Sequence, residues 1–390
     1  MTFPLLTRKP DSGLGNIRRS YADPSRNIDW ILMIAVLVQT TIGVFIIYSA
    51  TRPRLISLGQ DPYLFAQRQI IFIIVAGLAM TAVMSIDYGR LRGSAEILYV
   101  ANIFLLVLVL VIGAAKGGAR LSFDVGPIAI QPSELAKFTT LLLLAGFLAD
   151  SESETVPYER FIQSLFIVGL PVLLVGIAPD LGSASVTIAC AMGVLLVAGA
   201  KLRYILLVTS LAVTSIVVGV VSGIVKDYQI RRITGFLNQN SDSASLQNLL
   251  NQVRFAKRAV SNGGIFGRGY LNGPLTNGRF IPVQSTDFVF SAVGEQFGLV
   301  GCGLMLAIFV VILWRIFRIA RKAKDRLGLY LATGVFTMVL WQSFQNIGMT
   351  MGITPVSGVP LPFVSYGGSH TVAFALMIGV VQSVYMRRFR

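Results

Sequence analysis

Long stretches without a single Asp, Glu, Lys or Arg recur along this chain and decide what kind of fold it can adopt. A helix needs about 20 apolar residues to cross roughly 30 Å of hydrocarbon. Six charge-free stretches approach or exceed that length: 30–51, 69–86, 97–115, 161–179, 181–200 and 204–225. Each one predicts a membrane-spanning helix.

Four more spans follow if a membrane helix can carry a few charged groups. Residues 138–149 become long enough when Glu134 and Lys137 belong to the first turn, and residues 288–314 carry Glu295. Residues 327–386 contain no charge, and three prolines near their middle predict two helices around a turn. We therefore expect an all-α polytopic membrane protein with ten transmembrane helices.

The composition excludes most other classes of protein. Hydrophobic residues make up 54% of the 390 residues and charged residues only 13%, about half the charged share of soluble proteins. A soluble enzyme, a DNA-binding domain and a disordered chain are all excluded. The net charge of +15 would suggest nucleic-acid binding in a soluble protein, but in a membrane protein the cations are expected in the loops, and we expect no nucleic-acid partner. Cys190 and Cys302 lie in apolar stretches, so neither a disulfide framework nor a zinc site is indicated.

The positions of the cations predict the orientation. Ten spans place both termini on one side, and the positive-inside rule favours the cytoplasm for segments rich in Lys and Arg. We expect a cytoplasmic tail at 1–29, one membrane domain at 30–386 and a cytoplasmic C-terminus at 387–390. One dense group of cations predicts contact with anionic lipid on that face: Arg315, Arg318, Arg321, Lys322, Lys324 and Arg326.

The segment 226–287 is predicted to be a large extracytoplasmic loop between helices 7 and 8. Apolar residues recur there at helical spacing, which predicts an amphipathic helix on the outer leaflet: Leu246, Leu249, Leu250, Val253, Ala256 and Val260. The glycine-rich residues 262–269 follow. They fit either a flexible turn, which we favour, or a backbone site for an anion.

Ionisable residues at membrane depth are candidate functional groups because they cost free energy there. Glu134 and Lys137 lie three residues apart on one helix face and can form a pair. Asp287 and Asp180 each precede a predicted helix, so each can serve either as an N-cap or in the site. Glu295 can partner a buried cation or a backbone group. Together with nearby cations, these acids predict a polar cavity open to the outer leaflet, which an ion pathway, a lipid-substrate enzyme or a scaffold could use.

At these residues the chain resembles the shape, elongation, division and sporulation (SEDS) family of bacterial membrane glycosyltransferases. The resemblance covers nearly all ten spans. The motifs that carry it are QPSELAK at 131–137, PDLG at 179–182, STDF at 285–288 with Gly294 and Glu295, NIGM at 346–349, and PLPFVSYGGS at 360–369. The form GVPLP at 358–362 resembles the elongation branch more than the division branch, and His370 stands where a small residue is common.

The resemblance implies polymerisation of lipid II, an undecaprenyl-pyrophosphate-linked disaccharide pentapeptide, at the outer face of the cytoplasmic membrane. It implies that Asp287 is the essential acid and that Glu134 and Lys137 form an intramembrane pair. Ser365 and Tyr366 belong to a family motif and are expected to support the site. The implied partners are a class B penicillin-binding protein, which is a transpeptidase, and other membrane proteins of the elongation complex.

Our mechanistic hypothesis assigns Asp287 as the base that accepts the proton of the acceptor hydroxyl group. Four cations are candidates to contact the departing pyrophosphate: Lys116, Arg120, Lys137 and Arg268. The sequence requires no cofactor, although a divalent ion such as Mg²⁺ or Mn²⁺ could share that role. Two alternatives remain open, a flippase for the lipid-linked precursor and a scaffold in which Glu134→Gln and Lys137→Met are silent.

Overall fold

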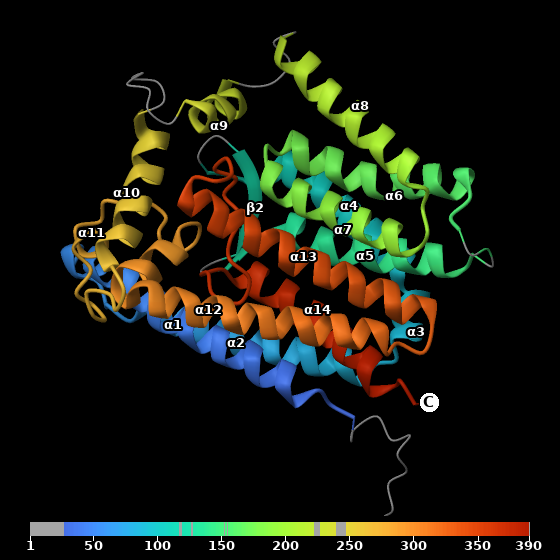
Figure 1. The fold of residues 1–390 in the computed structure, drawn as a ribbon, viewed down its shortest axis with the longest axis horizontal. Helices are drawn as coiled ribbons and strands as arrows, with labels where there is room; N and C mark the ends of the chain where they lie inside the picture. Colours follow the sequence, from blue (N-terminus) through green and yellow to red (C-terminus); the bar gives the residue numbers. More distant parts are fainter. Residues whose placement is uncertain are drawn as a thin grey trace, which may run out of the picture.

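The computed structural model describes residues 27–116, 119–125, 128–151, 153, 155–221, 227–238 and 247–389. Most of the long helices run along the long dimension of the molecule (Figure 1). The helices are α1 (Trp30–Ser57), α2 (Leu64–Ser85), α3 (Tyr88–Gly93), α4 (Ala95–Ile112), α5 (Pro132–Ala149), α6 (Tyr158–Ile177), α7 (Leu181–Val197), α8 (Leu202–Val221), α9 (Asp227–Leu237), α10 (Gln247–Gly263), α11 (Pro274–Asn277), α12 (Val289–Arg321), α13 (Arg326–Met351) and α14 (Gly368–Met386). Three strands, β1 (Ala114–Lys116), β2 (Ala119–Val125) and β3 (Ile128–Ile130), lie between α4 and α5.

Eight of the described helices are long and apolar enough to cross a membrane: α1, α2, α4, α5, α6, α12, α13 and α14. They match eight of the ten predicted spans. The other two predicted spans correspond to α7, which has 17 residues, and to α8, a helix of 20 residues whose side chains are described without gaps only over the apolar stretch Leu202–Leu211. The chain is therefore a multi-pass membrane protein, and ten crossings stay a prediction.

Aspartate side chains begin several of these helices. Asp29 accepts a hydrogen bond from the Leu32 amide at 3.0 Å, and Asp325 accepts one from the Gly328 amide at 2.8 Å. Such N-caps satisfy amide groups that have no partner inside the helix. The polar residues between the apolar stretches thus set where α1 and α13 start.

The two ends of the described chain lie at the same end of the helix bundle (Figure 1). The Asp29 amide donates to the Gln382 side chain at 3.0 Å, and Gln382 donates back to the Asp29 carbonyl at 3.0 Å. Arg315 Nε contacts both carboxylate oxygens of Asp29, at 3.0 and 3.1 Å, and Arg315 is buried. The expectation that Arg315 contacts lipid is therefore wrong, because this residue joins two helices inside the bundle.

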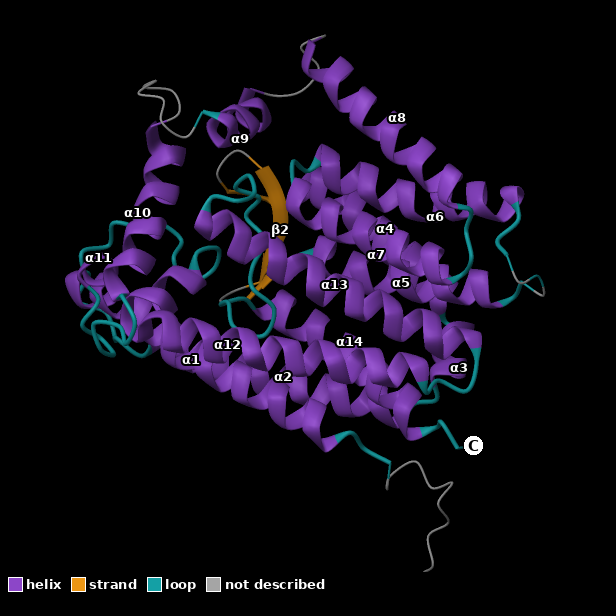
Figure 2. Cartoon of the chain, in the orientation of Figure 1, coloured by secondary structure: helices purple, strands orange, loops and turns teal. Residues whose placement is uncertain are grey.

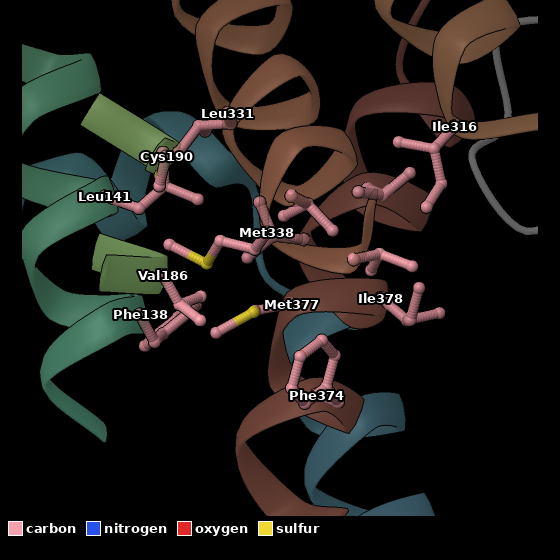
Figure 3. Close-up of a cluster of buried hydrophobic side chains, with 14 of the residues drawn as sticks. Phe138, Leu141, Val186, Cys190, Ile316, Leu331, Met338, Phe374, Met377 and Ile378 are labelled. Atoms are coloured by element: carbon pink, nitrogen blue, oxygen red, sulfur yellow. The ribbon is translucent and has the colours of Figure 1, made fainter. Parts of the chain in front are cut away.

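The hydrophobic core is centred on α5. In an 18-residue stretch of α5, 78% of the residues are buried, against 22% in α2 and 22% in α4, so α2 and α4 present most of their surface outward. Figure 3 shows Phe138 and Leu141 of α5 close to Val186 of α7, Met338 of α13 and Met377 of α14. Burial of these side chains fixes α5 among α7, α13 and α14.

The expectation of an all-helical chain missed the small sheet. Strand β2 is central and pairs antiparallel with both neighbours, with Ala115 opposite Arg120 and Asp124 opposite Ala129. Figure 2 shows β2 passing across the ends of helices. The predicted span 97–115 accordingly ends earlier, at Ile112. Strands of three to seven residues between two apolar stretches give no distinct hydropathy signal.

The predicted amphipathic helix is present as α10, although Leu246 lies outside the described residues. Its Leu250 and Ala256 are buried, and the helix packs against α12 and α13. The apolar face of α10 is therefore covered by protein and is not free to lie on the outer leaflet.

Helix α12 is broken at Gly298, whose backbone angles are φ 64° and ψ −158°. The glycine-rich residues after α10 fill the break. Four hydrogen bonds join the two segments: Arg268 N–H to the Glu295 carbonyl (2.9 Å), Gly269 N–H to the Gln296 carbonyl (3.0 Å), Leu299 N–H to the Gly264 carbonyl (2.9 Å) and Val300 N–H to the Ile265 carbonyl (3.0 Å). Because these amides donate to protein carbonyls, the turn interpretation holds and the anion interpretation does not.

Candidate functional site

A polar cavity of about 360 Å³ lies where the sheet meets the turn before α12 and the loop before α14. Strands β2 and β3 form one wall, and the segment 358–370 forms another. The residues that line it are Phe72, Leu121, Ser122, Ala129, Gln131, Thr286, Asp287, Gly358, Pro360, Tyr366, Gly367, Gly368, Ser369 and His370. Asp287 is the carboxylate among these described lining residues. Asp287 thus lines a cavity, as predicted, whereas the other predicted acids Glu134, Asp180 and Glu295 are not among its lining residues.

The backbone around Asp287 is tightly held. The Val283 carbonyl accepts hydrogen bonds from the amides of Thr286 (3.2 Å) and Asp287 (3.0 Å). Val283 has φ +53°, a conformation that is rare for a β-branched residue. The Asn346 side chain donates to the carbonyls of Asp287 and Val359, both at 2.7 Å. These contacts fix the turn that carries Asp287 against the loop after α13.

Asp287 does not act as the N-cap of α12. The cap residue is Phe288, and no side-chain hydrogen bond caps this helix. The carboxylate is partly exposed and lines the cavity. The capping alternative is therefore removed, and the carboxylate remains available for chemistry.

The surroundings of Asp287 raise the pKa of its carboxyl group above the ordinary value for aspartate. Burial is the main cause, and the nearby Asp180 carboxylate acts in the same direction. A hydrogen bond from Thr286 and the positive charge of Arg232 oppose the rise in pKa. A higher pKa makes Asp287 a stronger base than an ordinary aspartate.

Glu134 and Lys137 form the expected buried pair. The Lys137 Nζ atom lies 2.8 Å from Glu134, and the two side chains are 0% and 2% exposed. Lys137 also donates to Gln342 at 3.2 Å, and His370 Nδ1 lies 3.3 Å from Glu134. Because His370 lines the cavity, the pair stands behind the cavity wall. Lys137 is enclosed and does not line the cavity.

Asp180 serves as the N-cap of α7 and also joins that helix to α5. One carboxylate oxygen accepts from the Ser183 amide at 3.0 Å. The other accepts from Gln131 at 3.1 Å and from the Ser133 hydroxyl at 3.0 Å. Gln131 lines the cavity, so Asp180 supports the cavity wall from behind.

Ser365 and Tyr366 attach the loop before α14 to the turn that carries Asp287. The Ser365 hydroxyl donates to the Thr286 carbonyl at 2.5 Å and accepts from the Leu361 amide at 2.8 Å. The Tyr366 amide donates to the Ser285 carbonyl at 3.0 Å. Burial raises the pKa of the Tyr366 hydroxyl group, and the positive charge of Arg68 opposes this rise.

Glu295 and Arg268 lie away from the cavity lining. Glu295 is fully buried and accepts from the amides of Leu275 (2.7 Å) and Thr276 (2.9 Å), so it satisfies the start of α11. Arg268 is exposed, and its Nε atom donates to the Asn262 carbonyl at 2.8 Å. Of the two alternatives for Glu295, the backbone partner is the correct one.

Lys116 and Arg120 have described backbones in β1 and β2, whereas their side chains lie outside the described part of the structure. Across the residues that the structure describes, no three His, Cys, Asp or Glu side chains gather as a metal site.

Two residues near the site were not identified from sequence as functional. Arg232 of α9 affects the pKa of Asp287, but it is one of eight cations in the segment 226–287 and nothing local distinguishes it. His370 was noted only as a departure from the family pattern, yet it connects the cavity to Glu134.

Comparisons with known proteins cover nearly the whole chain. The family model described as cell cycle protein, for FtsW, RodA and SpoVE, matches residues 29–389. The chain is 34% identical to the stage V sporulation protein E of Bacillus subtilis over 359 residues, which are 91% of this chain and 96% of that protein. It is 32% identical to the peptidoglycan glycosyltransferase MrdB of Escherichia coli K12 over 363 residues, 93% of this chain and 94% of that protein. A solved structure on the coordination of polymerization and crosslinking by a peptidoglycan synthase complex is similar with a TM-score of 0.76 and 28% identity, covering 93% of this chain and 99% of that chain.

Proposed function

Because this chain belongs to the FtsW, RodA and SpoVE family of peptidoglycan glycosyltransferases, we propose that it polymerises lipid II at the outer face of the cytoplasmic membrane. The product is a glycan strand. The observation that carries this proposal is the Asp287 carboxylate in the wall of a polar cavity, held by a turn that Asn346 and Ser365 fix in place.

Asp287 acts as the general base in the proposed reaction. The 4-hydroxyl oxygen of the acceptor sugar attacks the anomeric carbon of the donor, and Asp287 accepts the hydroxyl proton. The new carbon–oxygen bond forms as the bond from that carbon to the pyrophosphate oxygen breaks. The pyrophosphate leaves with the electron pair. The raised pKa of Asp287 favours this proton transfer.

The buried pair has a positioning role in this proposal. Glu134 contacts His370, and His370 is part of the cavity wall. The pair and Gln342 therefore hold the start of α14 against α5, which maintains the shape of the cavity next to Asp287.

Within the family, we assign the chain to cell elongation, as in RodA, with a class B penicillin-binding protein as its partner. The elongation assignment depends on the form GVPLP at 358–362. The chain is 34% identical to the stage V sporulation protein E and 32% identical to MrdB. These two values are too similar to separate a sporulation role from an elongation role. The related synthase complex that couples polymerization to crosslinking supports a transpeptidase partner. If the chain acts in elongation with a class B penicillin-binding protein, the two proteins should co-purify from growing cells.

The proposed topology has ten crossings, cytoplasmic termini and an extracytoplasmic segment 226–287. The shared location of the two chain ends supports an even number of crossings. This topology places Asp287 on the outer side, where lipid II is polymerised.

The test is polymerisation of purified lipid II by the full-length protein with its partner in detergent or nanodiscs. We expect Asp287→Ala and Asp287→Asn to lower the rate by about 10²–10⁴-fold, the usual contribution of a general base. The matched control is Asp124→Asn, because Asp124 is exposed on β2 and does not line the cavity. A wild-type rate in Asp287→Ala would overturn the catalytic role. A wild-type protein that moves lipid II across vesicle membranes without making polymer would instead support the flippase.

A further inference from the structure

A second cavity, separate from the one that Asp287 lines, lies between α9, α10 and the loop after α13. Its volume is about 220 Å³, several times the roughly 30 Å³ that one water molecule takes up in liquid water. Four of its lining residues are cations: Arg232, Arg254, Lys257 and Arg258. The described lining residues include no acidic side chain. We refer to this cavity as the basic pocket.

The arrangement of these cations concentrates positive charge at one place. Arg254, Lys257 and Arg258 lie three and four residues apart on α10, so they share one helix face. Arg232 approaches them from α9. Guanidinium groups match the oxygens of phosphate in pairs, so a polyanion that contains phosphate fits this group of side chains.

The basic pocket lies beside Asp287. Gly358 lines the cavity that contains Asp287. A Cβ atom placed on Gly358 would lie 3.6 Å from Asp287 Oδ2 and 3.9 Å from both terminal nitrogens of Arg232. The base and one cation of the pocket therefore flank the same glycine, and the positive charge of Arg232 acts on Asp287 directly.

From this placement we infer that the basic pocket binds the pyrophosphate of the lipid-linked donor. The inference depends on the proposed glycosyl transfer, in which the pyrophosphate departs while Asp287 takes up a proton a short distance away. The four cations would stabilise the negative charge that the leaving group gains. The basic pocket takes the role that the sequence suggested for Lys137 and Arg268. Lys137 is enclosed, and Arg268 lines neither cavity.

Binding is tested with inorganic pyrophosphate as the probe, by thermal unfolding of the full-length protein in neutral detergent. We expect pyrophosphate to raise the unfolding temperature of the wild type and of the control Arg231→Gln. Arg231 is exposed on α9 and does not line the pocket. The double variant Arg254→Gln/Lys257→Gln should lose this rise. An equal rise in the double variant would overturn the inference.

A phospholipid headgroup presents the same phosphate chemistry, so a second arm uses phosphatidylglycerol with phosphatidylcholine as reference. Stabilisation by phosphatidylglycerol that requires Arg254 and Lys257, without any by pyrophosphate, would identify a phospholipid site and overturn the inference.

Kinetics separate this inference from the proposed function. We expect kcat/KM for lipid II to fall by about tenfold for each cation removed, which corresponds to one charge-assisted hydrogen bond. Arg232→Gln should show this loss and Arg231→Gln should not. If the wild type makes no polymer, the proposed function fails. If the wild type makes polymer and Arg232→Gln and the double variant match it, only the pyrophosphate site fails.

Discussion

Removing one member of the Glu134–Lys137 pair should destabilise the protein far more than removing both. Both side chains are almost completely enclosed, with Nζ 2.8 Å from the carboxylate. Lys137→Met leaves a buried carboxylate with the His370 contact at 3.3 Å. Glu134→Gln leaves a buried ammonium group beside the side-chain oxygen Oε1 of Gln342 at 3.2 Å.

The magnitude follows from the cost of an uncompensated buried charge. Each single variant should lower the free energy of unfolding by about 3–5 kcal/mol. The double variant Glu134→Gln/Lys137→Met contains no buried charge at either position and keeps similar side-chain volumes. It should lie within about 1 kcal/mol of the wild type, because replacement of a whole buried pair is often neutral. The coupling free energy is then about 5 kcal/mol or more.

The assay is equilibrium unfolding in mixed micelles, followed by circular dichroism, for the four proteins of a double-mutant cycle. The matched control is the same cycle on Arg92 and Asp150, an ion pair whose side chains are 41% and 47% exposed. That cycle should give no more than about 1 kcal/mol. If the Glu134 and Lys137 effects simply add in the double variant, the reasoning from buried charge is refuted.

Three further predictions concern the site and the broken helix. The acidic limb of the pH profile of kcat/KM should lie above ~3.9, the ordinary pKa of aspartate, since burial raises the pKa of Asp287. For the same reason, folding favours the protonated form, and its contribution to stability is lost as pH rises through the raised pKa. Asp287→Asn should therefore be more stable than the wild type at neutral pH by thermal unfolding. Asn346→Leu removes hydrogen bonds to the carbonyls of Asp287 and Val359 and should cost about 1–3 kcal/mol along with activity. An unchanged polymerisation rate would contradict this. Gly298→Ala should cost more than 1 kcal/mol, because φ is +64° and a Cβ atom would lie 2.6 Å from the Ile265 carbonyl oxygen. Gly303→Ala in the same helix, with no atom within 4 Å of the added Cβ, should be neutral or stabilising by up to about 1 kcal/mol, and equal losses in both would refute the explanation.

The sequence predicted the features that depend on neighbouring residues. Charge-free stretches identified the long helices because a bilayer excludes charge over a fixed thickness. The spacing of Glu134 and Lys137 predicted their pairing because residues three apart share a helix face. The position of Asp180 before an apolar stretch predicted its capping role, which the Ser183 amide confirms.

Features that join distant segments could not be predicted in this way. Arg315 pairs with Asp29, 286 residues away, and no local pattern distinguishes it from the cations beside it. Arg232 approaches Asp287 only because α9 and the loop after α13 meet. The sheet was not predicted because its strands are short and because their pairing depends on where α4 and α5 end.

The break in α12 has a consequence for how this protein can vary. The amides of Leu299 and Val300 would ordinarily donate to the carbonyls of Glu295 and Gln296, one turn earlier. Here the segment after α10 supplies both the acceptors and the donors instead. Excising that segment, or exchanging it for a shorter linker, would remove the partners of four backbone groups, and α12 could pair them again only if Gly298 adopted helical angles. The glycine-rich turn is thus part of the framework of α12, and the segment between α8 and α12 can be shortened without loss of these hydrogen bonds only upstream of the turn.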